Sequence, residues 1–318
     1  MGFVLAVTLP IYLGMALGFA AVRLGWLDAA EVRTLGKYTV RIGMPALLFR
    51  SLAHQSLDTV LQTDYLLVYA LASLSTMGLV GLVAQRLLHR PRTLAVLEAL
   101  GAAGSNSMFL GYPLALQVVG PVAGLALALC ALVENLLVIP LALALAETGT
   151  AAQNAGLAQR LRDYLHQLVR NPLILAMLAG LLVSASGLQL PTGVDKFVFM
   201  TASATSPVAL FVIGGSLVGL RLQGIRSDIA LIVLGKLLLH PLCVLGLLWL
   251  VPLAKPELGT AALLFAAVPM MSIYPVLAQR HGHERLCAAA LLVATLGSLL
   301  SIALGLALLQ AHGFVAQG

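Results

Sequence analysis

Residues 112–120 read Tyr-Pro-Leu-Ala-Leu-Gln-Val-Val-Gly, and residues 274–282 read Tyr-Pro-Val-Leu-Ala-Gln-Arg-His-Gly. The two strings share Tyr, Pro, Gln and Gly at the same spacing, and they lie 162 positions apart. Further pairs at this offset are Pro10 and Pro172, Pro45 and Pro207, Met15 and Met177, Gly18 and Gly180, and Phe49 and Phe211. One match would be chance, but three prolines with their flanks in a single register indicate an internal duplication.

The composition points to lipid as the solvent of this chain. Of 318 residues, 60% are hydrophobic and 9% are charged, with a mean hydropathy of +1.01. A soluble domain carries about 25% charged residues, so this chain could not cover a water-facing surface. The net charge of +6 does not indicate nucleic-acid binding, because the basic residues fall in short gaps between apolar runs. The lipid bilayer is therefore an expected partner, and nucleic acid is not.

Apolar runs of about the 20 residues that a spanning helix requires recur along the chain. They lie near 3–22, 33–53, 64–88, 93–119, 121–146, 171–189, 195–220, 228–252, 259–279 and 285–311. No run shows the alternation of a membrane barrel. The first run has no Lys or Arg before it, so we expect a retained helix rather than a cleaved signal. The sequence predicts an all-α membrane protein with ten transmembrane helices.

Basic residues distinguish the two sides of the predicted membrane. Loops after odd-numbered runs hold Arg23 and Arg33; Arg86, Arg90 and Arg92; Arg160, Arg162 and Arg170; Arg221 and Arg226; and Arg280 and Arg285. Loops after even-numbered runs hold Arg50, Lys196 and Lys255. The positive-inside rule then places the odd loops in the cytoplasm and both termini outside, in what we expect to be a bacterial inner membrane.

Each copy of the repeat contains five predicted spans. An odd number means that the second copy enters the membrane with opposite polarity, which gives two inverted five-helix repeats related by a pseudo-two-fold axis. We expect the first repeat over 1–146, a cytoplasmic linker over 147–170 and the second repeat over 171–318. Residues 159–169 are expected to form a short amphipathic helix.

The fourth and ninth runs are predicted to be broken crossover helices. Residues 104–113 read Gly-Ser-Asn-Ser-Met-Phe-Leu-Gly-Tyr-Pro, and residues 268–275 read Val-Pro-Met-Met-Ser-Ile-Tyr-Pro. Proline removes a backbone donor, and small polar residues beside it can satisfy the freed groups or a ligand. Asn106 lies about 21 Å inside its span, and Ser272 lies similarly deep. Half-helix N-termini that meet there would suit a carboxylate.

Charged residues well inside the predicted spans include Arg41, Glu98, Glu134 and Lys236. A charge at membrane depth requires a partner or a water-filled cavity. Two interpretations stay open. Glu98 and Glu134 could form structural ion pairs with Arg41 and Lys236. Alternatively, a basic residue attracts an anionic substrate while Glu134, or Glu98, carries a coupling proton.

No cofactor and no metal are expected. Cys130, Cys243 and Cys287 lie in apolar runs, as structural thiols do. The string at 281–284, His-Gly-His-Glu, sits in a short loop without further ligands. An intramembrane enzyme is disfavoured because neither Gly-x-Ser-x-Gly nor His-Glu-x-x-His occurs.

Several motifs together resemble the auxin efflux carrier family. They are residues 43–49 (Gly-Met-Pro-Ala-Leu-Leu-Phe), Asn106 with 111–114 (Gly-Tyr-Pro-Leu) and Gly120, 170–175 (Arg-Asn-Pro-Leu-Ile-Leu), 236–241 and 269–282. The resemblance covers nearly the whole chain. It implies ten helices like those of the bile acid symporter fold, a scaffold and a transport subdomain, a substrate site where spans four and nine cross, and a homodimer through the scaffold. By matching motif, Asn106, Pro113 and Pro275 are carried over as functional. Bacterial members of similar length include permeases for malonate and malate, and the absent long central loop makes auxin itself improbable.

The expected function is secondary active transport of small organic anions, such as mono- or dicarboxylates, by elevator-type alternating access. The expected substrate-binding positions are Ser105, Asn106, Ser107, Gly111, Tyr112, Pro113, Pro269, Ser272, Tyr274, Pro275, Arg41 and Lys236. The alternatives are an ion or proton channel, or a sodium-coupled organic anion symporter on the same fold. A purely structural subunit is disfavoured because paired breaks have a packing cost.

Overall fold

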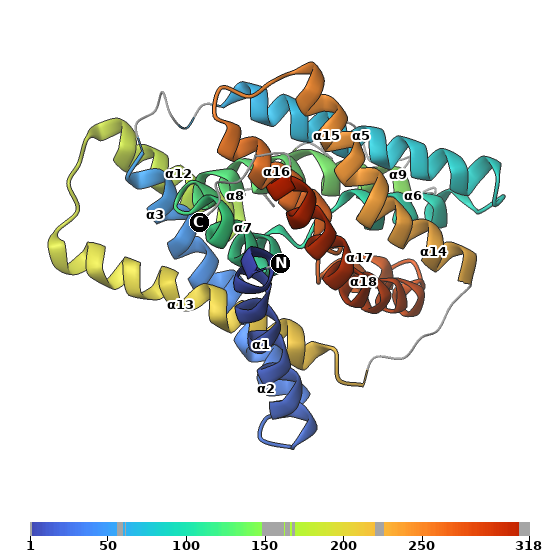
Figure 1. Cartoon of the computed structure of the whole chain (residues 1–318), viewed down its shortest axis with the longest axis horizontal. Helices are drawn as coiled ribbons and strands as arrows, with labels where there is room; N and C mark the ends of the chain where they lie inside the picture. Colours follow the sequence, from blue (N-terminus) through green and yellow to red (C-terminus); the bar gives the residue numbers. More distant parts are fainter. Residues whose placement is uncertain are drawn as a thin grey trace.

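A computed structural model describes residues 2–55, 60, 62–147, 162, 166, 169–219 and 226–311. Among these residues every regular element is helical (Figure 1). Most of the predicted linker, including most of the expected amphipathic helix at 159–169, lies outside the described residues.

The first half of the chain contains eight α-helices and three short π-helical turns in its described part. The helices are α1 (Gly2–Arg23), α2 (Ala29–Tyr38), α3 (Met44–Ala53), α5 (Thr63–Arg86), α6 (Arg92–Ala103), α7 (Tyr112–Val119), α8 (Val122–Val133) and α9 (Ile139–Ala146). The π turns are η1 (Thr39–Gly43), η2 (Ser107–Gly111) and η3 (Glu134–Val138). α2 begins four residues before the predicted run, because Asp28 and Glu31 form a capping box that starts the helix early.

The second half is built in the same manner. Its described helices are α12 (Pro172–Ser186), α13 (Thr192–Ser216), α14 (Arg226–Leu234), α15 (His240–Leu250), α16 (Pro256–Ala267), α17 (Tyr274–Gln279) and α18 (Glu284–Ala311), with the π turn η4 (Gly235–Leu239) between α14 and α15.

Six helical stretches within the described residues are long and apolar enough to cross a membrane. They are Gly2–Arg23, Thr63–Arg86, Val122–Ala146, Thr192–Ser216, Ser227–Leu250 and Glu284–Leu306. Pro172–Ser186 and Pro256–Ala267 are shorter apolar helices. The protein is therefore an all-helical, multi-pass membrane protein.

Each π turn is followed by a proline that explains it. Pro45, Pro113, Pro140 and Pro241 each stand two positions after the last residue of a π turn. A proline cannot donate to the carbonyl four residues back, and its ring clashes with that group. The residue before each proline instead donates to a carbonyl five residues back; His240, for example, bonds the carbonyl of Gly235. The wider turn accommodates the ring without ending the helix.

Contacts between the halves are reciprocal at the offset of the duplication. Gly18 lies directly against the backbone carbonyl of Phe211, and Gly180 lies directly against that of Phe49. Exchanging each residue for the one 162 positions away turns the first contact into the second. Such self-complementarity is what a two-fold relation produces.

The helices pack in two groups. α1, α2 and α3 pack with α12 and α13, whereas α5–α9 pack with α14–α18. Figure 1 shows α1–α3 in blue beside the yellow α12 and α13. Each group thus draws helices from both halves of the chain. The groups meet through α3 with α8, α13 with η2, and α1 with α7.

Candidate functional site

Two helix breaks meet inside the second packing group. The first break covers residues 104–106, between α6 and η2, and the second covers 268–273, between α16 and α17. The backbone N–H of Asn106 donates to the carbonyl of Pro269 over 2.8 Å, and its side-chain Nδ2 donates to the hydroxyl of Ser272 over 3.0 Å. Asn106 is buried whereas Ser272 is exposed, so this pair lies where the buried interior reaches the protein surface. We call residues 104–106 and 268–273 the crossing.

Glu134 holds the start of the second half-helix of the first break. Its Oε1 accepts the backbone N–H of Ser105 at 2.9 Å, and its Oε2 accepts the hydroxyl of Ser107 at 2.8 Å. The first N–H groups of a helix lack intrahelical partners and carry partial positive charge, so a carboxylate there is stabilising. Glu134 can occupy this place because it begins the π turn η3, and its side chain is 4% exposed.

Lys236 holds the opposite kind of helix end. Its Nζ donates to the carbonyl of Ala266 at 2.9 Å, in the last turn of α16. Carbonyls at a C-terminal helix end carry partial negative charge, which suits an ammonium group. Lys236 is fully buried in η4, at 0% exposure.

The ammonium of Lys236 has three protons and three acceptors. Besides Ala266, Nζ contacts the hydroxyl oxygen of Ser105 at 2.6 Å and Nδ1 of His240 at 2.8 Å. When Nδ1 accepts from the ammonium, the imidazole proton is on Nε2, which then donates to the Ser73 hydroxyl 3.2 Å away. The charge of Lys236 is thus fully satisfied by the protein in this conformation.

Ser105 connects the two buried charges. Its backbone N–H bonds Glu134 and its hydroxyl accepts from both Lys236 and Tyr69, the latter over 3.2 Å. Tyr69 also packs edge-on against His240, with ring centroids 5.8 Å apart. A negative and a positive side chain therefore meet at one residue of the crossing, and each faces the helix end of opposite sign.

Other predicted positions line or buttress the crossing. The hydroxyl of Tyr274 donates to the carbonyl of Leu97 at 3.0 Å. Gly111 lies where an added Cβ would come 2.7 Å from the ring of Phe265, so the close approach of η2 and α16 requires a glycine. Pro113 is buried in the first turn of α7, next to the partly buried Tyr112. Pro275 occupies the matching place in α17.

Arg41 and Glu98 are not joined to this network by any hydrogen bond or ion pair seen in the described residues. Arg41 is exposed in η1, which packs against α2, α3, α12 and α13. Glu98 is fully buried in α6, on the side of α14. Neither predicted ion pair, of Glu98 or Glu134 with Arg41 or Lys236, forms as a direct contact among the described side chains.

Sequence reasoning missed Tyr69, Ser73 and His240. The signal was present: Tyr69 and Ser73 are spaced i, i+4 within α5, and Lys236 and His240 are spaced i, i+4 across η4 and the start of α15. Residues four apart share a helix face, so each pair of polar side chains presents one face to the interior.

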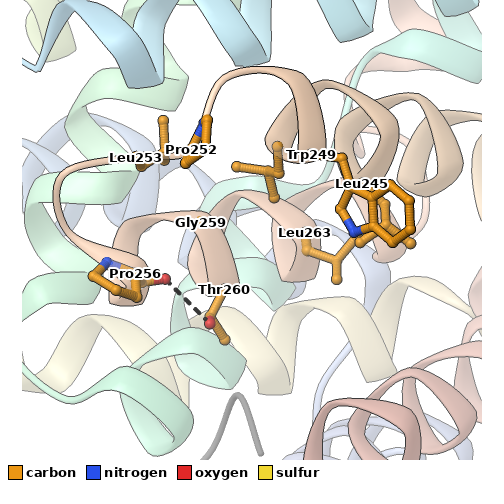
Figure 2. A pocket seen from close by; sticks show the side chains of 9 residues that line it. Leu245, Trp249, Pro252, Leu253, Pro256, Gly259, Thr260 and Leu263 are labelled. Atoms are coloured by element: carbon orange, nitrogen blue, oxygen red, sulfur yellow. Dashed lines mark hydrogen bonds between the residues drawn. The ribbon is translucent and has the colours of Figure 1, made fainter. Parts of the chain in front are cut away.

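One apolar cavity lies away from these charges. It has a volume of about 370 Å³ and is formed by α15, the following loop and α16. Figure 2 shows Trp249 and Leu263 on its wall, with the Thr260 hydroxyl bonded back to the carbonyl of Pro256. No charged side chain lines it. It offers an anion no charged partner, so the polar crossing remains the better candidate site.

The fold is that of a multi-pass helical membrane protein with a buried polar crossing. A family model described as "Membrane transport protein" matches residues 3–306. The chain belongs to this family, which is the auxin efflux carrier family. It is also 26% identical over 310 residues to a Rhizobium meliloti (strain 1021) protein named "Putative malonate transporter", covering 95% of this chain and 94% of that protein.

Proposed function

We propose that this membrane transporter is a secondary carrier for small organic anions, mono- or dicarboxylates such as malonate. The observation that carries the proposal is the pairing of two helix breaks through Asn106, with Ser272 exposed beside it. The similarity to a protein named for malonate transport supports the substrate class. A substrate carboxylate would first meet the Ser272 hydroxyl and the Asn106 amide, near the positive ends of η2 and α17.

The proposed site contains one buried basic side chain, Lys236, and one buried acidic side chain, Glu134. Lys236 supplies positive potential at the crossing, yet all three of its protons are engaged. Substrate binding would draw on this potential without removing the ammonium from its partners. Asn106 and Ser272 are then the direct ligands, and Lys236 and Glu134 keep the two helix ends in place.

We further propose an inverted repeat that works by an elevator-type movement. The crossing, Glu134 and Lys236 all belong to the second packing group, so they would move together against α1–α3, α12 and α13. The reciprocal contacts of Gly18 and Gly180 support a pseudo-two-fold, which supplies inward-open and outward-open states by exchange of the two halves. A coupling proton and a homodimer formed through α1–α3, α12 and α13 belong to the same proposal.

The test is uptake of labelled malonate, malate and indole-acetate by purified protein in liposomes, with and without an imposed pH gradient. We expect saturable uptake of one acid and exchange against internal substrate, which a channel would not give. Asn106→Ala should lower uptake at least about tenfold, the loss expected when a ligand hydrogen bond is removed. Asn135→Ala is the matched control, since Asn135 bonds only the carbonyl of Ala131 in its own helix. Unchanged uptake in an Asn106→Ala protein of normal abundance would refute the site assignment.

A further inference from the structure

Glu98 is a buried carboxyl group without a donor. Its side chain is 0% exposed, and neither Oε1 nor Oε2 has a hydrogen-bond partner. Asp228, on the neighbouring helix α14, is 1% exposed, and its Oδ2 is also without a partner. The other oxygen, Oδ1, accepts from Arg90 at 2.7 and 2.9 Å and from the Ser227 hydroxyl at 3.2 Å.

The packing of α6 on α14 places these two carboxyl groups on neighbouring helices, close enough for the charge of Asp228 to act on Glu98. An added Cβ on Gly101 would come 2.9 Å from Ile232, and one on Gly235 would come 2.8 Å from Ala102, so the helices run side by side in the same sense. Glu98 lies three residues before Gly101, and Asp228 lies four residues before Ile232. Residues spaced by three or four share a helix face, which puts both carboxyls on the facing sides.

We propose that Glu98 is the proton-binding site of this protein and that Asp228 is its hydrogen-bond partner. Arg90 forms an ion pair with Oδ1 of Asp228, whereas an ionised Glu98 carboxylate would be buried without a donor. A proton on Glu98 removes that charge and supplies a donor for Oδ2 of Asp228. Glu134 differs, because both of its oxygens already accept hydrogen bonds, from the backbone N–H of Ser105 and the hydroxyl of Ser107.

The surroundings of Glu98 contain few other ionisable groups. Asp228 and Arg90 interact with it from the α14 side, and Tyr274 and Cys287 interact with it from α17 and α18. On η4, Lys236 is committed to Ser105, His240 and Ala266. The facing helix α9 has no ionisable residue, and Arg86 at the end of α5 is exposed. Among the residues that the structure describes, no ammonium or guanidinium group is therefore in direct contact with the Glu98 carboxyl.

Glu98 is also attached to the crossing. The backbone carbonyl of Leu97, the neighbour of Glu98, accepts a hydrogen bond from the hydroxyl of Tyr274, and Gly101 lies against the ring of the same tyrosine. Tyr274 follows Ser272 by two residues. A change of charge at Glu98 thus acts on the turn of α6 that contacts Tyr274 of α17. Through this contact, a proton on Glu98 could change the conformation of the crossing.

A first test reads the proton directly and needs no substrate. The measurement is the infrared difference spectrum of purified protein between about pH 6 and 8. Exposed carboxyl groups titrate near 4, so they do not contribute to the difference in this range. We expect a protonated-carboxyl C=O band in the unmodified protein and in the control Glu257→Gln, an exposed residue of α16. The band should be absent in Glu98→Gln, and Glu98→Ala should give the same result. A band that persists in both Glu98 variants would overturn the proposal.

A second test concerns coupling and rests on the proposed transport function. In liposomes, Glu98→Gln should exchange internal for external substrate at equal pH, yet show the same uptake with and without a pH gradient. Stimulation by the gradient that survives in Glu98→Gln would also overturn the proposal. If the infrared band is lost in the Glu98 variants but the unmodified protein transports none of the tested acids, the proposed proton site is supported and the proposed carboxylate transport is refuted.

Discussion

At the scale of single residues, Lys236 decides how the second break is held. Lys236→Met removes the ammonium and leaves the Ala266 carbonyl and Nδ1 of His240 without this donor, while the Ser105 hydroxyl retains only the hydrogen bond from Tyr69. Removing one member of a buried charge pair costs about 3–5 kcal/mol. In this protein Ser105 stands between the two charges. We therefore expect Lys236→Met to lower the free energy of unfolding by an amount in the lower part of that range.

The measurement is the unfolding midpoint of detergent-purified protein. Lys37→Met, at an exposed position of α2, is the control and should stay within about 0.5 kcal/mol of the unmodified protein. Equal midpoints for the Lys236 and Lys37 variants would mean that the ammonium does not stabilise the end of α16.

Part of this site could be predicted from the sequence. Asn106, Ser272, Glu134 and Lys236 stand out because polar and charged residues are costly in apolar runs. What each one contacts could not be predicted, since the partners come from other helices. One of the two interpretations left open paired Lys236 with a carboxylate side chain, but its partners are a hydroxyl, an imidazole and a backbone carbonyl. The free carbonyl exists only because α16 ends there.

At the scale of elements, the π turns are what the sequence did not predict. Prolines indicated kinks, and the structure resolves several of them as single wide turns. The break at 104–106 was expected from its glycine, serine and asparagine. The π form could not be foreseen, because a proline inside a helix does not require it: α1 and α13 contain Pro10 and Pro207 without a π turn.

The π turn η4 could be maintained by Pro241 or by the hydrogen bonds of the Lys236 side chain, and these two causes predict different results. Pro241→Ala restores a backbone donor and would gain about 1 kcal/mol if the turn became α-helical. That change rotates the preceding residues by about 100° and would pull Lys236 from its three acceptors, each worth about 1.5–3 kcal/mol. The side-chain bonds are the larger quantity, so the π turn should persist in Pro241→Ala.

Unfolding midpoints of the two single variants and the double variant test this. Pro241→Ala alone should change the free energy of unfolding by no more than about 1 kcal/mol. In the presence of Lys236→Met it should be stabilising, because nothing then opposes the α-helical turn. If Pro241→Ala alone is as damaging as Lys236→Met, proline itself maintains the turn. Pro10→Ala, in a helix without a π turn, is the matched control.

At the scale of the whole molecule, the packing of the halves depends on glycines at equivalent positions. A Cβ on Gly18 would overlap the Phe211 carbonyl, and one on Gly180 would come 2.7 Å from the Phe49 carbonyl. Alanine at either position must push two helices apart, so each variant should lose about 1–3 kcal/mol, the usual cost of overpacking. Gly78→Ala and Gly246→Ala, which meet nothing within 4 Å, should be neutral or slightly stabilising when their midpoints are compared. A tolerated Gly180→Ala beside a damaging Gly18→Ala would contradict the equivalence of the two contacts.

The inverted orientation of the halves can be tested with one pair of cysteines. His89 follows α5 and Val251 follows α15, and the two positions are 162 residues apart. If five spans separate the copies, equivalent loops lie on opposite sides of the membrane, and the positive-inside rule predicts that His89 is on the cytoplasmic side. In a background without Cys130, Cys243 and Cys287, a membrane-impermeant thiol reagent applied outside intact cells should label Val251→Cys and spare His89→Cys. Permeabilised cells should label both. Labelling of both or neither from outside would mean that the copies are parallel, and the pseudo-two-fold and the alternating access derived from it would fail together.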